Sequence, residues 1–273
     1  MSYDLYAELV EKTQTREERD IDALVQGKIG KYSISSIAAR IQLLAGIAAR
    51  NNAIKEYAIS GDPKQGGGYK SLVHNTSGYD NFIKGEMKTI KSLKLLPSPP
   101  DVSLLPPGSW FLQFTFTLAK PWISKDDDPF YVAESVNPVR KDKVFKVPVM
   151  SAAGWKGLLR WTLMHIRLAL KKDQRNPQCF AMERFVQTLL FGDEQGEETG
   201  QVKGFAKHVD SLKPEARAEY ERLLRQYYGV EENDPFPHHA GRLNFYPTFF
   251  DRIDVEVINP HSRETKAGTH PIS

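Results

Sequence analysis

Residues 147–172 are VPVMSAAGWKGLLRWTLMHIRLALKK, and this stretch carries most of what the sequence predicts. An extended piece around Pro148 gives way to four small residues, 151–154, and then to a long amphipathic pattern. Apolar residues recur at helical spacing, so we predict a helix over 151–171. The apolar stripe expected to face a core consists of Trp155, Leu158, Leu159, Leu163, Ile166 and Leu170.

The start of this predicted helix suits a phosphate group. Small side chains at 151–154 allow another backbone to approach the first-turn amides. Those amides lack helical partners and lie at the positive end of the helix dipole. A basic stripe follows, which at about 100° per residue spans roughly 60° and consists of Lys156, Arg160, Arg167 and Lys171. This pattern indicates either a surface that follows a sugar–phosphate backbone or the solvated face of an ordinary amphipathic helix.

Upstream, residues 1–94 are predicted to form a helical region. Ser33 or Ser35 is a candidate N-cap for a helix whose apolar positions include Ile41 and Ile47. A shorter helix is expected around 80–93. The segment 95–109 contains five prolines, which exclude a helix or a central strand, so we interpret it as a linker.

Past this linker the period changes to that of a strand. In residues 110–118, large apolar side chains alternate with Gln113, Thr115 and Thr117, which predicts a half-buried strand. Helices are expected over 178–190, ending at Gly192, and after Pro214. Strands are expected in 241–250 and 252–258. This order predicts an α+β fold with an antiparallel sheet.

Composition sets broad limits on the class of protein. The 273 residues are 40% hydrophobic and carry a net charge of +3, which is typical of a globular chain. No stretch has the ~18 uncharged apolar residues of a transmembrane helix, so we expect no membrane span. Cys179 is the single cysteine, which excludes an internal disulfide and makes a cytoplasmic location the expectation.

Several motifs in sequence order resemble one superfamily. VPVMSAAGWKGLLR resembles the signature of the repeat-associated mysterious protein (RAMP) superfamily, in which Leu-Lys-Gly-x-Leu-Arg opens a helix; here Trp155 replaces the first Leu. ESVNPVRKDKVFKVP resembles the loop before that motif in backbone subunits. LLFGDE, GRLNFYPTFF and VINPHSRETKAGTHPI resemble later motifs. The resemblance covers about 108–273, and residues 1–107 match no family that we can name.

The resemblance implies a ferredoxin-like (RRM-like) fold for residues 110–273 and a place in a type III CRISPR effector complex. Such subunits stack with other effector subunits along a guide CRISPR RNA and contact target RNA, reading backbone and shape. The candidate RNA-binding residues are Arg140, Lys141, Lys143, Ser151, Gly154, Trp155, Lys156, Arg160, Arg167 and Arg242. Family members usually continue past the His-Pro-Ile region, which leaves open that this domain is truncated at its C-terminus.

Cleavage of target RNA is a second implication of the resemblance. Family subunits that cut place an Asp shortly before a Pro-hydrophobic pair, where this chain has Val136. The acidic candidates in the same loop are Asp126, Asp127, Asp128 and Glu134. They could activate a ribose 2′-OH or hold a divalent ion such as Mg²⁺, or they form a solvated turn. No cofactor is otherwise expected.

The histidines and two alternative functions complete the predictions. We expect no metal site at His238, His239 or His261, because no carboxylate lies at ligand spacing, and His165 is expected to pack or lie at the surface.

One alternative function is a metal-independent endoribonuclease that processes the guide precursor, which needs a His–Tyr–Lys set around one cleft. The other is a non-catalytic structural adaptor, whose mark would be an unusually apolar surface on the long helix.

Overall fold

The computed structural model describes residues 17–59, 68–74, 77–120, 122, 139–194 and 204–253. The chain forms two compact units, one comprising Met1–Val149 with Phe249–Ser273 and the other Met150–Thr248. Helices predominate among the described residues. These residues also form two small two-stranded sheets, in which β1 pairs with β2 and β3 pairs with β4. The α+β class predicted from sequence is therefore confirmed at this coarse level. The described residues contain no helix that is both long and apolar enough to cross a membrane.

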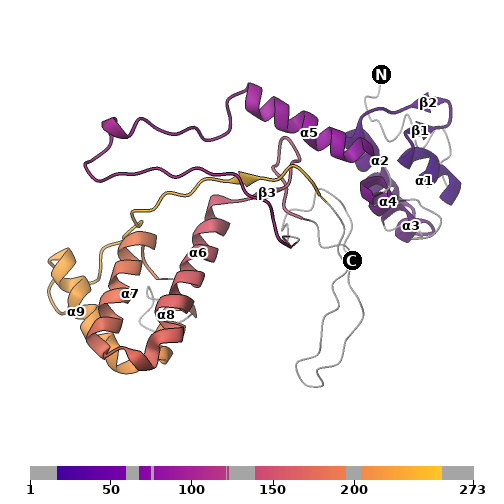
Figure 1. The fold of residues 1–273 in the computed structure, drawn as a ribbon. Coiled ribbons are helices and arrows are strands. Elements are labelled where there is room, and N and C mark those ends of the chain that lie inside the picture. The colour runs from indigo at the N-terminus through magenta and orange to yellow at the C-terminus, as the bar shows by residue number, and fades with distance from the viewer. Residues whose placement is uncertain are drawn as a thin grey trace. The chain divides into compact units, whose positions relative to one another are not determined.

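The first unit is mainly helical, and its N-terminal part is coloured indigo to magenta in Figure 1. Its α-helices are α1 (Glu18–Val25), α2 (Ile37–Arg50), α3 (Lys55–Ile59), α4 (Gly68–His74) and α5 (Ser77–Ser92). The short elements are β1 (Lys28–Ile29), β2 (Tyr32–Ser33) and the 3-10 turn η2 (Val102–Leu104). Strands β1 and β2 pair antiparallel, with Ile29 opposite Tyr32. Helices are thus present, as expected, in the part of 1–94 that the structure describes.

Helix α2 forms the centre of this unit. The Ser36 side chain accepts the Ala39 N–H and caps the helix, one residue beyond the predicted cap at Ser35. Arg40 ties the helix to the preceding segment, because its guanidinium donates to the carbonyls of Ile34 and Val25. The buried side of α2 consists of Ile37, Ile41, Leu43, Leu44, Ile47 and Ala48.

The core of the first unit also includes residues well past the proline-rich segment. Val147 is fully buried in the same apolar cluster as α2, and Phe145 and Phe249 pack against it. The division between the units therefore falls at 149/150 and 248/249, not at the predicted linker 95–109. Local composition identified the irregular segment correctly, but long-range apolar contacts decide where a compact unit ends.

The segment 110–118 differs from the strand predicted there. It has no assigned strand, and its five alternating apolar side chains are exposed, from Phe116 at 38% to Trp110 at 69%. Phe116 has an edge contact with Phe250, with ring centroids 6.4 Å apart. Strand preference reflects packing on a paired, half-buried surface. The described residues supply no neighbouring strand for this segment.

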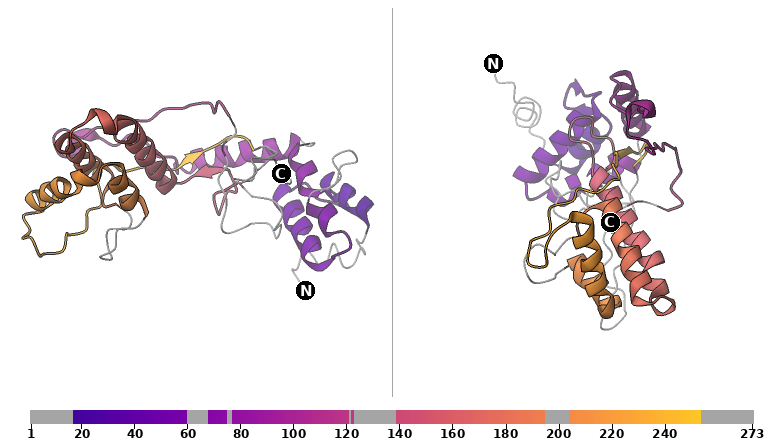
Figure 2. Two further views of the ribbon diagram at one scale, coloured as in Figure 1. Left: turned by 90° about the horizontal axis from the view of Figure 1, so that it is seen from below. Right: turned by 90° about the vertical axis from the view of Figure 1, so that its left-hand side faces the viewer.

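In the second unit, the described residues form the α-helices α6 (Ala152–Arg167), α7 (Pro177–Phe191), α8 (Gly204–Leu212) and α9 (Arg217–Tyr228). Its shorter elements are the 3-10 segments η3 (Ala169–Gln174) and η4 (Pro214–Ala216). Strands β3 (Val149–Met150) and β4 (Thr248–Phe249) pair with each other where the chain enters and leaves this unit. Helix α6 packs against α7, and Figure 2 shows the helices of this unit, coloured rose to orange, gathered together in both views. The helices predicted over 178–190 and after Pro214 are confirmed, and Gly192 is the C-cap of α7.

The core of this unit lies on one side of the α6–α7 pair. It consists of Met164, Leu168, Phe180, Ala181, Val209, Ala216, Tyr220, Leu223 and Leu224. Within α6 only Met164 is buried. Of the six residues predicted to face a core, Trp155 and Leu163 are half-buried and the other four are exposed, with Leu158, Leu159 and Ile166 each about 40–50% exposed. The helix prediction is correct and the prediction of its buried face is wrong.

Candidate nucleic-acid interface

The start of α6 is an open, capped helix end. Ser151 is the N-cap, and its hydroxyl accepts the Gly154 N–H at 3.1 Å. Ala153 and Gly154 are exposed, so the first turn is accessible. Trp155 fixes the helix on its other side, because its indole N–H donates to the Thr248 hydroxyl at 2.8 Å. The end of the helix that the sequence singled out therefore faces outward.

Beside this helix, two glycines let two backbone segments cross, and we call this feature the glycine crossing (Gly192 with Gly241). Both residues have positive φ, 86° and 81°. A Cβ on Gly192 would lie 2.5 Å from the His239 carbonyl oxygen, and one on Gly241 would lie 2.5 Å from the Gly192 nitrogen. Any side chain at either position would displace backbone, so both steric space and conformation require glycine.

Main-chain hydrogen bonds fix this crossing. The amides of Arg242 and Leu243 donate to the carbonyls of Leu189 and Leu190, each at 3.0 Å. In the opposite direction, the Asp193 amide donates to the His239 carbonyl at 3.0 Å. These bonds bring the LLFGDE and GRLNFYPTFF motifs together, although about 50 residues separate them in the sequence. The two motifs thus form one local structure.

Arg160 stabilises the crossing from α6. Its guanidinium donates to the carbonyls of Asp193 at 2.7 Å and Gly192 at 3.0 Å, and it lies over the Phe205 ring at 4.9 Å. The charged group is partly buried and engaged by the protein's own backbone. Arg160 was predicted as a phosphate contact, and that prediction remains untested. The geometry gives this residue a positioning role.

Lys156 and Arg242 are the cations best placed at the open side of the site. The Lys156 ammonium lies 3.4 Å from the Ala240 carbonyl, a long and weak contact two residues before Arg242. Arg242 is exposed, and its guanidinium donates to the Tyr227 hydroxyl at 3.2 Å. Together with the small residues at the start of α6, these cations suit a bound anion.

The rest of the predicted basic stripe has other partners. Arg167 forms a two-point interaction with Glu183 at 3.2 Å, and Arg175 also reaches Glu183 at 3.3 Å. Burial alone would raise the pKa of Glu183, but the hydrogen bonds and charges of the two arginines outweigh it and lower that pKa. Arg167 therefore links α6 to α7, at the opposite end of the helix from Ser151.

The remaining predicted residues lie elsewhere in the chain. Arg140 and Lys143 are exposed in the first unit, whereas Lys141 is buried and its ammonium donates to the Val139 carbonyl at 3.1 Å. The catalytic candidates Asp126, Asp127, Asp128 and Glu134 lie outside the described residues, as does His261. Their predicted roles in cleavage and in holding Mg²⁺ therefore remain predictions.

The neighbouring histidines bind protein groups. His238 Nδ1 lies 2.7 Å from an Asp193 carboxylate oxygen that also accepts the His239 N–H. The His239 ring lies near Tyr227 and Tyr228, and its Nε2 donates to the Leu189 carbonyl at 3.2 Å. The described residues contain no group of three or more metal-ligating side chains. The fold brings a His, a Tyr and a Lys near the crossing, but Nε2 of His239 points into the protein.

A buried ion pair lies behind the crossing, and sequence patterns alone did not predict it. Arg184 is 1% exposed and binds both carboxylate oxygens of Glu194, at 2.6 and 3.0 Å, and one of Asp210 at 2.5 Å. Its guanidinium also lies 4.1 Å from the Tyr220 ring centroid. Burial would lower the pKa of Arg184, but Glu194 outweighs it and raises that pKa. An arginine among apolar helical positions is the only signal the sequence offered.

Comparisons with known proteins identify no relative. No protein-family model, curated protein or solved structure matches the chain. The site must therefore be interpreted from its own residues. It consists of an exposed helix start, two cations and a glycine crossing fixed by Arg160.

Proposed function

We propose that this chain is an RNA-binding backbone subunit of a type III CRISPR effector complex, holding guide RNA and contacting target RNA. The proposal includes a ferredoxin-like domain over 110–273, whose sheet would need strands beyond the paired β3 and β4. The ordered motifs that resemble the RAMP superfamily support it. LLFGDE and GRLNFYPTFF pair with each other at the glycine crossing, and Arg160 of VPVMSAAGWKGLLR binds the same crossing. That juxtaposition at the glycine crossing is the observation on which the proposal depends.

The chemistry of the site fits a sugar–phosphate chain. The amides of Ala152 and Ala153 at the start of α6 and the cations Lys156 and Arg242 would contact phosphate oxygens. These contacts carry no base information, which suits a subunit that holds a guide while base pairing reads the sequence. Arg160 would act indirectly, because it fixes the carbonyls of Gly192 and Asp193 and so positions the loop that carries Arg242.

A charge-reversal experiment tests this proposal. The variants Lys156→Glu and Arg242→Glu should each weaken the binding of a single-stranded RNA and reduce the salt slope by about 1, because each removes the cation that neutralises one phosphate. Lys207→Glu is the matched control, because Lys207 is exposed on α8 in the same unit. Equal RNA affinities and salt slopes for all three variants and the parent chain would contradict the proposed interface.

Cleavage of target RNA needs its own test. Alanine at Asp126, Asp127 and Asp128 together should abolish target cutting by the assembled complex if this loop supplies the carboxylate. RNA binding should be retained, because the proposed phosphate contacts lie in 150–248. Undiminished cutting would remove these residues from the reaction.

A structural adaptor is the second candidate function, and one observation favours it. The mark expected of an adaptor is an apolar surface on the long helix, and α6 exposes Leu158, Leu159 and Ile166. A basic RNA-binding edge and an apolar protein-binding face can coexist on one helix, because they occupy different sides of it. The two candidate functions are therefore separable by mutation.

A further inference from the structure

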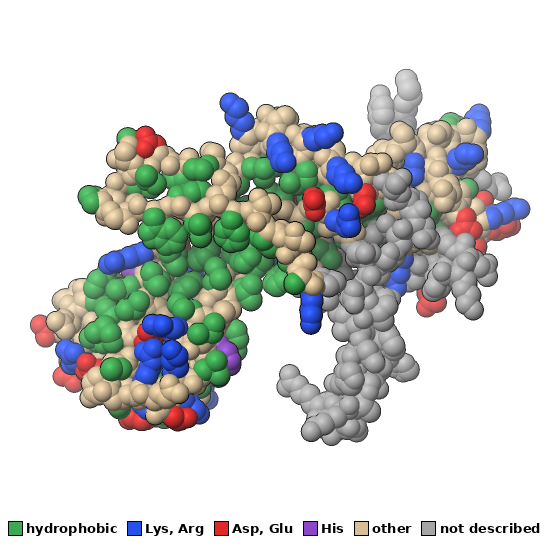
Figure 3. Space-filling model, in the orientation of Figure 1, with side chains coloured by type: hydrophobic (Ala, Val, Ile, Leu, Met, Phe, Trp, Pro, Cys, Tyr) green, Lys and Arg blue, Asp and Glu red, His purple; other side chains and the backbone are tan. Residues whose placement is uncertain are grey.

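Helices α6 and α7 and the η3 segment between them present an exposed apolar surface, which we call the outer face and define by Leu159, Ile166 and Leu170 with Cys179, Met182 and Val186. All six residues are exposed, and the five other than Cys179 range from 40% exposed at Leu159 to 65% at Leu170. Figure 3 shows hydrophobic side chains over the helices of this unit, with lysine and arginine side chains among them. A contiguous apolar patch of this kind marks an interaction site more often than a random surface.

Helical geometry places the five members of the outer face that lie on α6 and α7 on one side of the hairpin, and Leu170 follows in η3. Helices α6 and α7 run antiparallel, and Arg167 reaches Glu183 across their seam. At about 100° per residue, the exposed apolar positions lie roughly a quarter-turn from the seam on each helix. The core positions, Met164 on α6 and Phe180 on α7, lie on the opposite side of the seam. The outer face therefore points away from α8 and α9.

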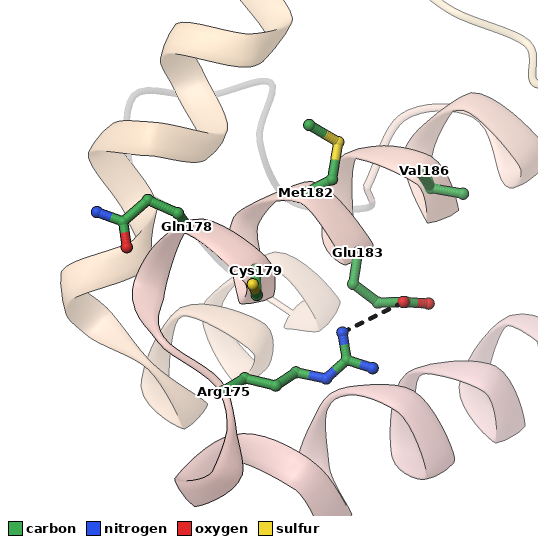
Figure 4. A pocket seen from close by; sticks show the side chains of 6 residues that line it. All are labelled: Arg175, Gln178, Cys179, Met182, Glu183 and Val186. Carbon is green, nitrogen blue, oxygen red and sulfur yellow. Dashed lines mark hydrogen bonds and ion pairs between the residues drawn. The ribbon is translucent and has the colours of Figure 1, made fainter.

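The surface is hollowed beside α7. A shallow, open depression of about 400 Å³ is lined by Arg175, Gln178, Cys179, Met182, Glu183 and Val186. In Figure 4, Met182 projects from the upper side of α7, while the carboxylate of Glu183 points the other way and binds Arg175. A concave surface with an apolar wall and charged groups at its edge fits the ridge of another helix.

The charges around the outer face determine which kind of helix would fit. Residues 167–183, which lie beside the outer face, contain four lysines and arginines against two acidic residues, a net charge of +2. Of the two acidic residues, Glu183 is already bound by both Arg167 and Arg175. The other two cations of this segment, Lys171 and Lys172, lie at the hairpin turn. A complementary partner must therefore be acidic at its edges.

We propose that the outer face binds an acidic amphipathic helix of a partner protein. Its apolar residues, at i, i+3/i+4 and i+7, would cover Ile166, Met182 and Val186, and its flanking carboxylates would lie beside Arg167 and Arg175. This inference deepens the adaptor function by naming the chemistry of its partner. It does not depend on RNA binding, because the proposed RNA contacts lie at the other end of α6 and on the 238–242 loop.

Other occupants fit the outer face less well. A second copy of the chain would bring two surfaces of like charge together, which opposes association. RNA would find an aliphatic centre without an aromatic ring on which a base could stack. An anionic membrane is flat and would leave the hollow beside α7 unfilled. Each of these occupants gives a distinct result in the experiment below.

Cys179 makes the proposal directly measurable, because it is the single cysteine and lies in the outer face. Its alkylation by a maleimide should be fast in the free full-length protein. A designed helical peptide with a leucine stripe and glutamate flanks should slow this reaction about tenfold at saturation. The same peptide with lysine flanks should give little protection. Met182→Glu should abolish protection, whereas Leu104→Glu, at a side chain 83% exposed, should not.

A photo-crosslinker in place of Val186 then identifies the natural occupant in cells that express the chain. The proposal predicts crosslinks to peptides with an apolar helical stripe and net negative charge, and their loss with Met182→Glu. Crosslinks to the chain itself, to RNA or to lipid would overturn it, as would no crosslink at all. Slow alkylation of Cys179 in the free protein would also overturn it, because another part of the chain would then cover the face. Lys156→Glu should leave every one of these readouts unchanged, which separates failure here from failure of RNA binding.

Discussion

Helices α2 and α6 have similar lengths and similarly apolar sequences, but they are used in different ways. Helix α2 spans 14 residues and buries six of them, whereas α6 spans 16 and buries Met164 alone. The first unit is held by an almost wholly apolar core around α2. The second unit instead places an arginine and two acidic residues, Arg184, Glu194 and Asp210, at the centre of its helices. An apolar pattern thus predicts a helix, but it does not determine whether the apolar face meets a core or a partner.

The largest expected effect on stability comes from removing the buried arginine of the second unit. Arg184→Ala should lower the free energy of unfolding of the second unit by about 3–5 kcal/mol, because Glu194 would remain buried without a partner. Urea unfolding followed by tryptophan fluorescence measures the change. Arg222→Ala, which removes an exposed pair with Glu219, should leave the unfolding curve almost unchanged. Equal losses for the two variants would show that the core of this unit does not rely on Arg184.

Matched truncations test the comparison itself. Ile47→Ala in α2 should cost about 2–5 kcal/mol, because its side chain is 1% exposed. Ile166→Ala in α6, at 48% exposed, should change stability by less than about 0.5 kcal/mol. Thermal unfolding of both variants compares the two sites. A large loss from Ile166→Ala in the isolated protein would show that the outer face is part of a core.

The next largest loss of stability is expected from a substitution at the glycine crossing. Gly192→Ala should destabilise the second unit by about 2 kcal/mol or more, because the new Cβ would collide with the His239 carbonyl at positive φ. Gly229→Ala is the control, since Gly229 also ends a helix at positive φ but has open space around it. That substitution should cost about 1 kcal/mol. Hydrogen exchange at the Arg242 amide should rise sharply in the first variant and stay unchanged in the second.

The smallest expected effect is the acid sensitivity of the α6–α7 seam. Folding lowers the pKa of Glu183 below its ordinary value of 4.5, so the carboxylate stabilises the folded state above that pH. This contribution is lost as the pH falls through the lower, folded-state pKa. Glu183→Gln should therefore cost about 1 kcal/mol or less at pH 7 and almost nothing at strongly acidic pH. Unfolding curves at both pH values would contradict this account if the difference grew on acidification.

Local sequence patterns predicted where helices begin and end better than they predicted which side of each helix is buried. The helix expected over 151–171 exists as Ala152–Arg167, and Gly192 ends the next helix as its sequence indicates. Helical period identifies a stripe but not what covers it, and for this reason the buried face of α6 was wrongly predicted. The strand expected in 110–118 failed for a related reason, since alternation stabilises a strand only beside a paired neighbour.

The candidate site was predictable only in part. Ser151 was expected at the start of the helix, and its hydroxyl does cap α6. The partners of Arg160 could not be predicted, because they are carbonyls of Gly192 and Asp193, more than 30 residues away, which only the folded chain brings near. The same holds for the approach of Gly192 to Gly241, where each glycine alone indicates no more than a turn.

Crosslinking of bound RNA to the protein tests the central claim most directly. After ultraviolet irradiation of the purified chain with single-stranded RNA, peptide mapping by mass spectrometry locates the adducts. Our account predicts adducts at residues 151–157 and around Arg242, and their loss in the Lys156→Glu, Arg242→Glu double variant. Adducts confined to other segments, or undiminished in that variant, would contradict it.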